Sequence, residues 1–139
     1  MNTHALAASA ARLETPAYAA LRFVAGAMFL FHGAQKLLGW FATSPGPAVG
    51  TQLWLGGIIE LVTGTLIALG LFTRAAAFLA SGTMAVAYLQ FHWKLSVVSW
   101  AWLPIVNKGE LAALYCFVFL FVLARGPGPV SLDRALRRR

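Results

Sequence analysis

The chain has 139 residues, of which 60% are hydrophobic and only 11% are charged. A soluble domain of this size could not bury so many apolar side chains, so the composition indicates an integral membrane protein. The formal net charge of +7 does not indicate nucleic-acid binding, because the basic residues flank apolar runs instead of forming a stripe across polar surface. The single cysteine, Cys116, excludes an intramolecular disulfide and a dithiol redox pair.

The first apolar stretch predicts a transmembrane helix over residues 18–41. Arg22 and Lys36 lie near its opposite ends, where their side chains extend outward to the lipid headgroups. The preceding residues 1–17 are alanine-rich and predict a short surface helix that Pro16 interrupts. The apolar stretch also contains three polar residues, His32, Gln35 and Lys36. A signal peptide would carry a small-residue cleavage site there instead, so we expect the segment to be retained.

The second predicted span, residues 52–72, contains one charged residue, Glu60. A carboxylate about 12 Å deep in a hydrocarbon layer about 30 Å thick costs on the order of 3 kcal/mol unless it faces protein or water. Small residues recur at intervals of four around it, at Gly56, Gly64 and Ala68. The pattern predicts a helix-packing face with a polar group in its seam.

A third span is predicted over residues 75–92, after a tight turn at 73–74. Ala77, Ser81 and Ala85 form a second face of small residues, which predicts that the second and third helices pack as a close hairpin. Residues 93–106 contain Trp93, Trp100 and Trp102. Tryptophan concentrates at membrane interfaces, so this segment is expected to be interfacial or re-entrant.

The fourth span is predicted over residues 109–124, with Asn107 as its N-cap and Glu110 completing a capping box. The tail, residues 125–139, is basic, breaks at two Gly-Pro steps and predicts a short helix capped by Ser131. Its arginines are expected to contact anionic lipid headgroups.

These spans define the fold class as an all-α integral membrane protein, a single-domain bundle of four transmembrane helices. Four crossings place all eight arginines on the side of the two termini and all three lysines on the other side. The positive-inside rule then predicts cytoplasmic termini and a location in the bacterial inner membrane.

The polar residues inside or beside the spans gather at the end opposite the termini. Candidate catalytic residues there are Glu60, His32, Lys36 and Glu110. Candidate residues of a polar cofactor-binding pocket are His32, Gln35, Lys36, Glu60, His92 and Asn107. Other roles remain open: Lys36 and Glu60 as a structural ion pair, Glu110 as a helix cap and the histidines as packing residues. No metal site is expected, because no close ligand motif is present and the lysines would repel a cation.

In several of these residues and their spacing, the chain resembles the DoxX family of small bacterial membrane proteins. The matching positions are Arg22, Gly26, His32, Gly33, Lys36, Glu60, Gly64, 70–74, Asn107, Gly109, Glu110, Tyr115, Gly126, Gly128 and 131–133. The resemblance implies a four-helix membrane protein. Related proteins include the DoxD-type subunit of thiosulfate:quinone oxidoreductase and a mycobacterial member associated with a membrane redox complex that handles thiol stress. The implied theme is redox chemistry involving the quinone pool.

Three functional hypotheses follow. In the first, the chain is a redox-associated subunit whose pocket receives a quinone: Lys36 and His32 donate to a quinone oxygen, and Glu60, Glu110 or His92 exchanges the proton. The chain has no flavin, nicotinamide or haem motif, so it carries no complete catalytic machinery and other redox subunits are expected as partners. In the second, it is a non-catalytic scaffold that assembles such a complex. An oligomer of this chain is compatible with either hypothesis. The third is a small-solute pathway.

Overall fold

The computed structural model describes residues 3–138, and every regular element in that range is helical. The elements are α1 (Thr3–Leu38), α2 (Gln52–Leu69), α3 (Thr73–Ala87), the π-helix η1 (Tyr88–Trp93), the 3₁₀-helix η2 (Val98–Trp100), α4 (Pro104–Asn107), α5 (Glu110–Arg125) and α6 (Leu132–Leu136). Two described helices, Ala11–Leu38 within α1 and Gln52–Leu69, are long and apolar enough to cross a membrane.

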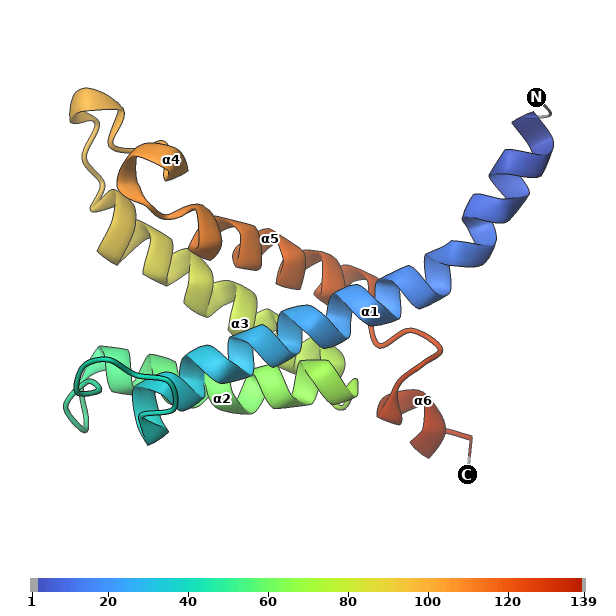
Figure 1. The fold of residues 1–139 in the computed structure, drawn as a ribbon, viewed down its shortest axis with the longest axis horizontal. Helices are drawn as coiled ribbons and strands as arrows, with labels where there is room; N and C mark the ends of the chain where they lie inside the picture. The colour runs from blue at the N-terminus through green and yellow to red at the C-terminus, as the bar shows by residue number, and fades with distance from the viewer. Residues whose placement is uncertain (1–2, 139) are drawn as a thin grey trace.

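Helix α1 contains Pro16 in its interior, so the expectation that this proline interrupts the helix is wrong. A proline removes one backbone hydrogen bond and displaces a carbonyl of the preceding turn, which a long helix can accommodate by bending. Figure 1 shows α1 changing direction in its N-terminal part.

Helices α1 and α2 pack through glycines. A Cβ added to Gly26 would lie 2.5 Å from the backbone nitrogen of Ala68, and one added to Gly64 would overlap the backbone of α1. Gly56 is not part of this face, contrary to the sequence prediction: a Cβ there would meet no atom within 4 Å, whereas one on Gly57 would touch the Lys36 side chain. The reason is the helical period of 3.6 residues, from which a strict four-residue spacing drifts away.

Helices α3 and α5 form the second closely packed pair. Ala77 and Ser81 are buried, and the Ser81 hydroxyl donates to the Cys116 carbonyl of α5 at 2.9 Å. The predicted small-residue face is therefore present. Helix α3 also contacts α2, as the predicted hairpin requires, but the small-residue face packs against α5. The face accommodates the large side chains of α5, of which Phe119 is fully buried.

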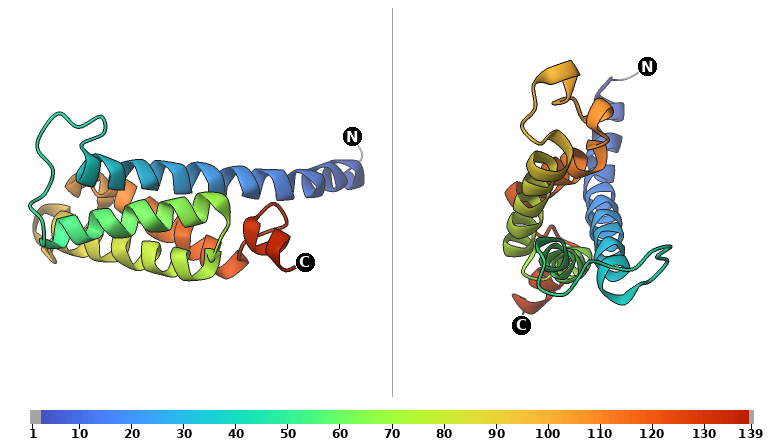
Figure 2. Two further views of the ribbon diagram at one scale, coloured as in Figure 1. Left: turned by 90° about the horizontal axis from the view of Figure 1, so that it is seen from below. Right: turned by 90° about the vertical axis from the view of Figure 1, so that its left-hand side faces the viewer.

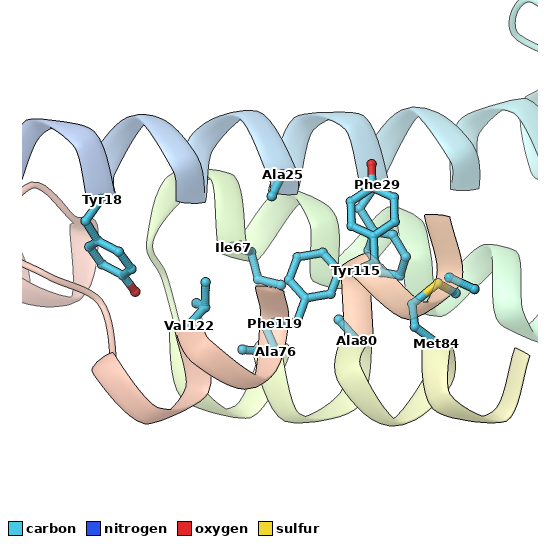
Figure 3. Close-up of a cluster of buried hydrophobic side chains, with 12 residues drawn as sticks. Tyr18, Ala25, Phe29, Ile67, Ala76, Ala80, Met84, Tyr115, Phe119 and Val122 are labelled. Carbon is cyan, nitrogen blue, oxygen red and sulfur yellow. The ribbon is translucent and has the colours of Figure 1, made fainter. Parts of the chain in front are cut away.

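The two helix pairs cross and diverge toward one end (Figures 1 and 2). We call that end, with the connections 39–51 and 94–109, the loop end. The opposite end, where α2 and α5 finish near α6, is the tail end. Figure 3 shows the core between the pairs, where Phe29, Ile67 and Phe119 meet.

At the tail end Arg22 is only 3% exposed, so the expectation that its side chain extends outward to headgroups is wrong. Its guanidinium donates to the carbonyls of Ile67, of Ala68 at 3.1 Å and of Val130 at 2.7 Å. The last carbonyls of a helix have no partner within the helix, and Arg22 supplies donors to two of those of α2. Arg22 thereby ties α1, α2 and the tail together.

At the loop end α5 begins at Glu110, with Gly109 as its N-cap and no side-chain cap, so the predicted capping box is wrong. Asn107 instead ends α4, and Lys108 follows in the left-handed conformation with φ 59°. Asn107 therefore precedes the α5 N-cap by two residues and does not occupy it. Its Oδ1 accepts from the Gly109 amide at 2.8 Å, and its Nδ2 donates to the Ala101 carbonyl at 2.9 Å, which fixes the turn.

Candidate functional site

A cavity of about 290 Å³ lies between the two helix pairs toward the loop end, and we call it the polar cavity. Its polar or titratable lining residues are His32, Lys36, Glu60, His92, Lys108 and Tyr115. Its apolar lining residues are Phe29, Leu53, Met84, Ala87, Phe91, Leu111 and Ala112. All four long helices and η1 contribute to the wall, so the cavity exists only in the folded arrangement of both pairs.

Lys36 of α1 and Glu60 of α2 form an ion pair in this wall, with 2.5 Å between Nζ and Oε1. The close glycine contacts of α1 with α2 bring the two backbones near enough for the side chains to meet. The Lys36 side chain is 33% exposed and that of Glu60 only 4% exposed. The second carboxylate oxygen of Glu60, Oε2, is buried and has no hydrogen-bond partner among the described residues.

Tyr115 of α5 supplies a second buried polar atom without a partner, its hydroxyl oxygen. The ring is held on several sides: it stacks on Phe119 with 5.4 Å between centroids, and the His32 ring lies edge-on at 6.1 Å. Figure 3 shows Tyr115 next to Phe29 and Phe119 in the core. A buried polar group left unpaired costs about 1–3 kcal/mol, so the Tyr115 hydroxyl and Glu60 Oε2 are available to a ligand.

The remaining basic residues of the lining, His92 and Lys108, lie on the η1 and α5 side of the cavity. The Nδ1 atom of His92 is 3.3 Å from the Asn107 carbonyl oxygen, which orients the ring. The chain reaches His92 through the π-helix η1, a rare geometry that recurs at functional sites. With Lys36 and Lys108 against Glu60 alone, the charges of the lining favour an electron-rich ligand oxygen.

Of the candidate site residues, the structure brings His32, Lys36, Glu60 and His92 together in the polar cavity. Gln35 lies outside it, is exposed and donates to the Phe41 carbonyl at 3.4 Å. Asn107 does not line the cavity either, although its carbonyl contacts His92. Glu110 is exposed at the start of α5 and is likewise absent from the lining. These three residues lie at helix ends or in turns. At such places the position of a residue along the helix axis does not predict the direction in which its side chain points.

Sequence reasoning missed Tyr115 and Lys108 as members of the site. Tyr115 had a readable signal, because a phenol in the middle of an apolar helix needs a partner for its hydroxyl. Lys108 had none: its direction follows from the left-handed turn at that residue.

A second cavity, of about 500 Å³, lies against α3, η1 and α5 and is lined by uncharged residues that include Trp93, Trp102 and Cys116. Two of the three tryptophans of the predicted interfacial segment line it, Trp93 and Trp102. Because it has almost no polar surface, it offers no acid–base chemistry, and the polar cavity is the better candidate site.

The regular elements of the described residues are all helices, two of them of membrane-spanning length and joined by a partly buried ion pair, which are the features of a small helical membrane protein. Residues 17–93, more than half of the chain, match the DoxX family model. The chain belongs to the DoxX family, which confirms the resemblance.

Two curated proteins are similar to this chain over most of its length. An uncharacterized protein of Haemophilus influenzae is 42% identical over 116 residues, covering 81% of this chain and 85% of the relative. An uncharacterized membrane protein of Mycobacterium tuberculosis is 33% identical over 138 residues, covering 89% and 83%. No solved structure matches the chain.

Proposed function

We propose that the protein is a four-span protein of the bacterial inner membrane, with both termini in the cytoplasm. Helices α1 and α2 have the required length. Helix α3 continues directly into η1, from Thr73 to Trp93, and α5 adds a fourth apolar helix. The arginines of the tail end and the lysines of the loop end support the orientation through the positive-inside rule.

Within that frame, the polar cavity is proposed to bind the headgroup of a quinone, as part of a redox-associated membrane subunit. One observation carries the proposal: two buried polar atoms, Glu60 Oε2 and the Tyr115 hydroxyl, lack partners in the wall of one cavity. The Tyr115 hydroxyl can donate to a carbonyl oxygen of a quinone, and Glu60 Oε2 can accept from a hydroxyl of the reduced quinol. A quinone takes up two electrons and two protons when it is reduced. The electrons come from a partner subunit.

The chain's own residues then have distinct roles. The Tyr115 hydroxyl and the Lys36 ammonium donate to ligand oxygens, and His32 positions the Tyr115 ring through their edge-on contact. Glu60 holds or releases a proton at Oε2, the carboxylate oxygen that the ion pair leaves free. His92, oriented by the Asn107 carbonyl, is the second proton-exchanging group.

The size of the cavity and its rim support a headgroup with an apolar tail. About 290 Å³ is close to the lower limit of about 300 Å³ for small-molecule pockets, which suits a single ring system. Leu53, Phe91 and Leu111 line the same cavity and are each more than 40% exposed. They offer an apolar exit along which an isoprenoid tail reaches the lipid.

The test is quinone binding by the full chain in lipid nanodiscs, measured by quenching of tryptophan fluorescence with a short-tailed benzoquinone and a naphthoquinone. Tyr115→Phe should weaken binding about 5- to 10-fold, the value of one neutral hydrogen bond of about 1–1.4 kcal/mol. Tyr18→Phe is the matched control, because that hydroxyl donates to the Gly126 carbonyl at the tail end, outside the polar cavity. Failure of both quinones to bind, with no quinone retained after mild extraction, overturns the proposal.

The scaffold hypothesis is the second candidate, favoured by the Lys36–Glu60 ion pair and the glycine contacts around it. If the pair only fastens α1 to α2, the exchange variant Lys36→Glu with Glu60→Lys should fold and should rescue the phenotype of a deletion strain. A folded exchange variant that fails to complement the strain argues against a purely structural pair.

A further inference from the structure

A third cavity, of about 400 Å³, lies at the tail end between the end of α5, the Gly-Pro loop and α6. We call it the arginine cavity. Its charged lining residues are Arg125, Arg134, Arg137, Arg138 and Asp133. It lies at the opposite end of the molecule from the polar cavity, and the two cavities share no lining residue.

The one acid of the arginine cavity is already engaged elsewhere. The Asp133 carboxylate accepts from the Phe72 amide at 2.8 Å and from the Thr73 amide and hydroxyl at 3.0 and 2.8 Å. Both oxygens are therefore directed at the start of α3. The charge of Asp133 offsets only part of the surrounding positive charge.

The arginines of the arginine cavity differ in whether their guanidinium groups already have partners. Arg125 pairs with Glu14 at 2.5 Å and lies over the Tyr18 ring at 5.0 Å from its centroid. For the side chains of Arg134, Arg137 and Arg138, residues 11–138 provide no hydrogen bond or ion pair. Three exposed guanidinium groups thus border one concave surface and retain all of their donors.

Helix α6 carries apolar residues on its other side. Leu132 and Leu136 are one helical turn apart and are 42% and 59% exposed, whereas Arg134 lies on the opposite face. A short helix with leucines on one face and arginines on the other lies in a membrane interface, with the leucines at the acyl boundary and the arginines at the phosphate level.

We propose that the arginine cavity binds the phosphate group of an anionic phospholipid, at the membrane surface that the two termini face. Guanidinium groups recognise phosphate oxygens with paired hydrogen bonds, and anionic lipids attract basic segments beside spanning helices. The exposed leucines of α6 favour a lipid over a soluble phosphate, because they contact the acyl chains of the molecule whose phosphate is bound.

The test measures lipid retention by the full-length protein in mild detergent, using native mass spectrometry with phosphatidylglycerol, cardiolipin or phosphatidylcholine added. Arg134→Gln with Arg137→Gln should weaken binding of the anionic lipids about 30-fold, equal to about 2 kcal/mol at about 1 kcal/mol per arginine. Arg12→Gln with Arg74→Gln is the matched control, because it removes the same charge from two described, exposed residues outside the cavity lining. Thermal unfolding verifies that all variants are folded.

Three outcomes overturn the proposal. Equal loss of lipid in the two double variants would mean diffuse attraction to basic residues instead of a site. Equal retention of phosphatidylcholine would mean that phosphate in a zwitterionic headgroup suffices. Displacement of phosphatidylglycerol by stoichiometric inorganic phosphate or pyrophosphate would identify a soluble ligand. Retention of anionic lipid that is lost selectively in Arg134→Gln/Arg137→Gln supports it.

Discussion

Asp133 reaches back 60 residues along the chain to Thr73, accepting hydrogen bonds from both its amide and its hydroxyl. The amides at the start of a helix have no acceptors within the helix, and Asp133 supplies them for α3. In the opposite direction, the Asp133 amide donates to the Gly70 carbonyl at 2.9 Å. The basic tail is therefore fastened to the turn between α2 and α3.

This contact predicts a loss of stability in acid. Burial alone would raise the pKa of Asp133, but hydrogen bonds from Thr73 and Phe72 and the charge of Arg137 hold it below its ordinary value. Because the pKa of Asp133 is lower in the folded state than in the unfolded state, its ionised carboxylate stabilises the fold fully above about pH 4. That stabilisation is lost as the pH falls through the folded-state pKa. The thermal midpoint of the detergent-solubilised protein should fall in that range. Asp133→Asn should cost about 1–2 kcal/mol at pH 7 and flatten the acid limb, whereas Glu14→Gln should leave that limb in place.

Replacing Arg22 should destabilise the tail end. Arg22→Met removes a donor from three carbonyls, of which that of Ile67 keeps the Gly70 amide and those of Ala68 and Val130 lose the arginine. We expect a loss of about 2 kcal/mol or more in the free energy of unfolding. Arg22→Lys should recover only part of it, because one ammonium cannot span the positions that the planar guanidinium reaches. Arg12→Met, an exposed position on the same helix, should change stability by less than about 0.5 kcal/mol. Equal midpoints for Arg22→Met and Arg12→Met would contradict this reading.

The glycines of α1 and α2 provide a matched pair of substitutions. Gly26→Ala forces a methyl group into the α2 backbone and should cost about 1–3 kcal/mol. Gly56→Ala meets open space and should be neutral or stabilising by up to about 1 kcal/mol. Denaturation of both variants in the same detergent measures the difference. A Gly26→Ala protein as stable as Gly56→Ala would mean that α1 and α2 do not pack this closely.

A double-mutant cycle separates the structural and ligand-binding roles of Lys36 and Glu60. Lys36→Met should cost about 3–5 kcal/mol, because it leaves a buried carboxylate unpaired. Lys36→Met with Glu60→Leu should be clearly more stable than Lys36→Met, with a coupling energy on the order of 2 kcal/mol. If the polar cavity binds quinone, that stable double variant should nevertheless fail to bind it. Additive effects on stability would rule out the ion pair.

Parts of this architecture follow from the sequence. Isolated charges in apolar segments must find partners, which predicts Lys36 beside Glu60, and the structure contains that pair. The Ser131 cap of α6 is also confirmed, since its hydroxyl accepts from the Arg134 amide at 3.3 Å. Both follow from local rules: the cost of a buried charge and the hydrogen-bonding needs of a helix start.

Other parts depend on tertiary contacts that no local pattern specifies. A row of small residues shows that something approaches closely, but the row containing Ser81 did not reveal that its partner is α5 and not α2. Arg22 was placed at a headgroup because its sequence position marks a helix end; its acceptors, including Val130, are far away in the chain. Tyr115 belongs to the site only because the two helix pairs cross where they do.

The contacts of Arg22 and Asp133 hold the tail end, whereas the polar cavity lies where the helix pairs spread apart. Widening that cavity requires a change in the angle between α1–α2 and α3–α5, and neither pair needs to lose its own internal packing. The angle between the two helix pairs, which the contacts at the tail end hold, therefore determines the size of ligand that fits. Substitutions at Arg22 or Asp133, neither of which lines the polar cavity, should alter the affinity of that cavity for its ligand through this angle.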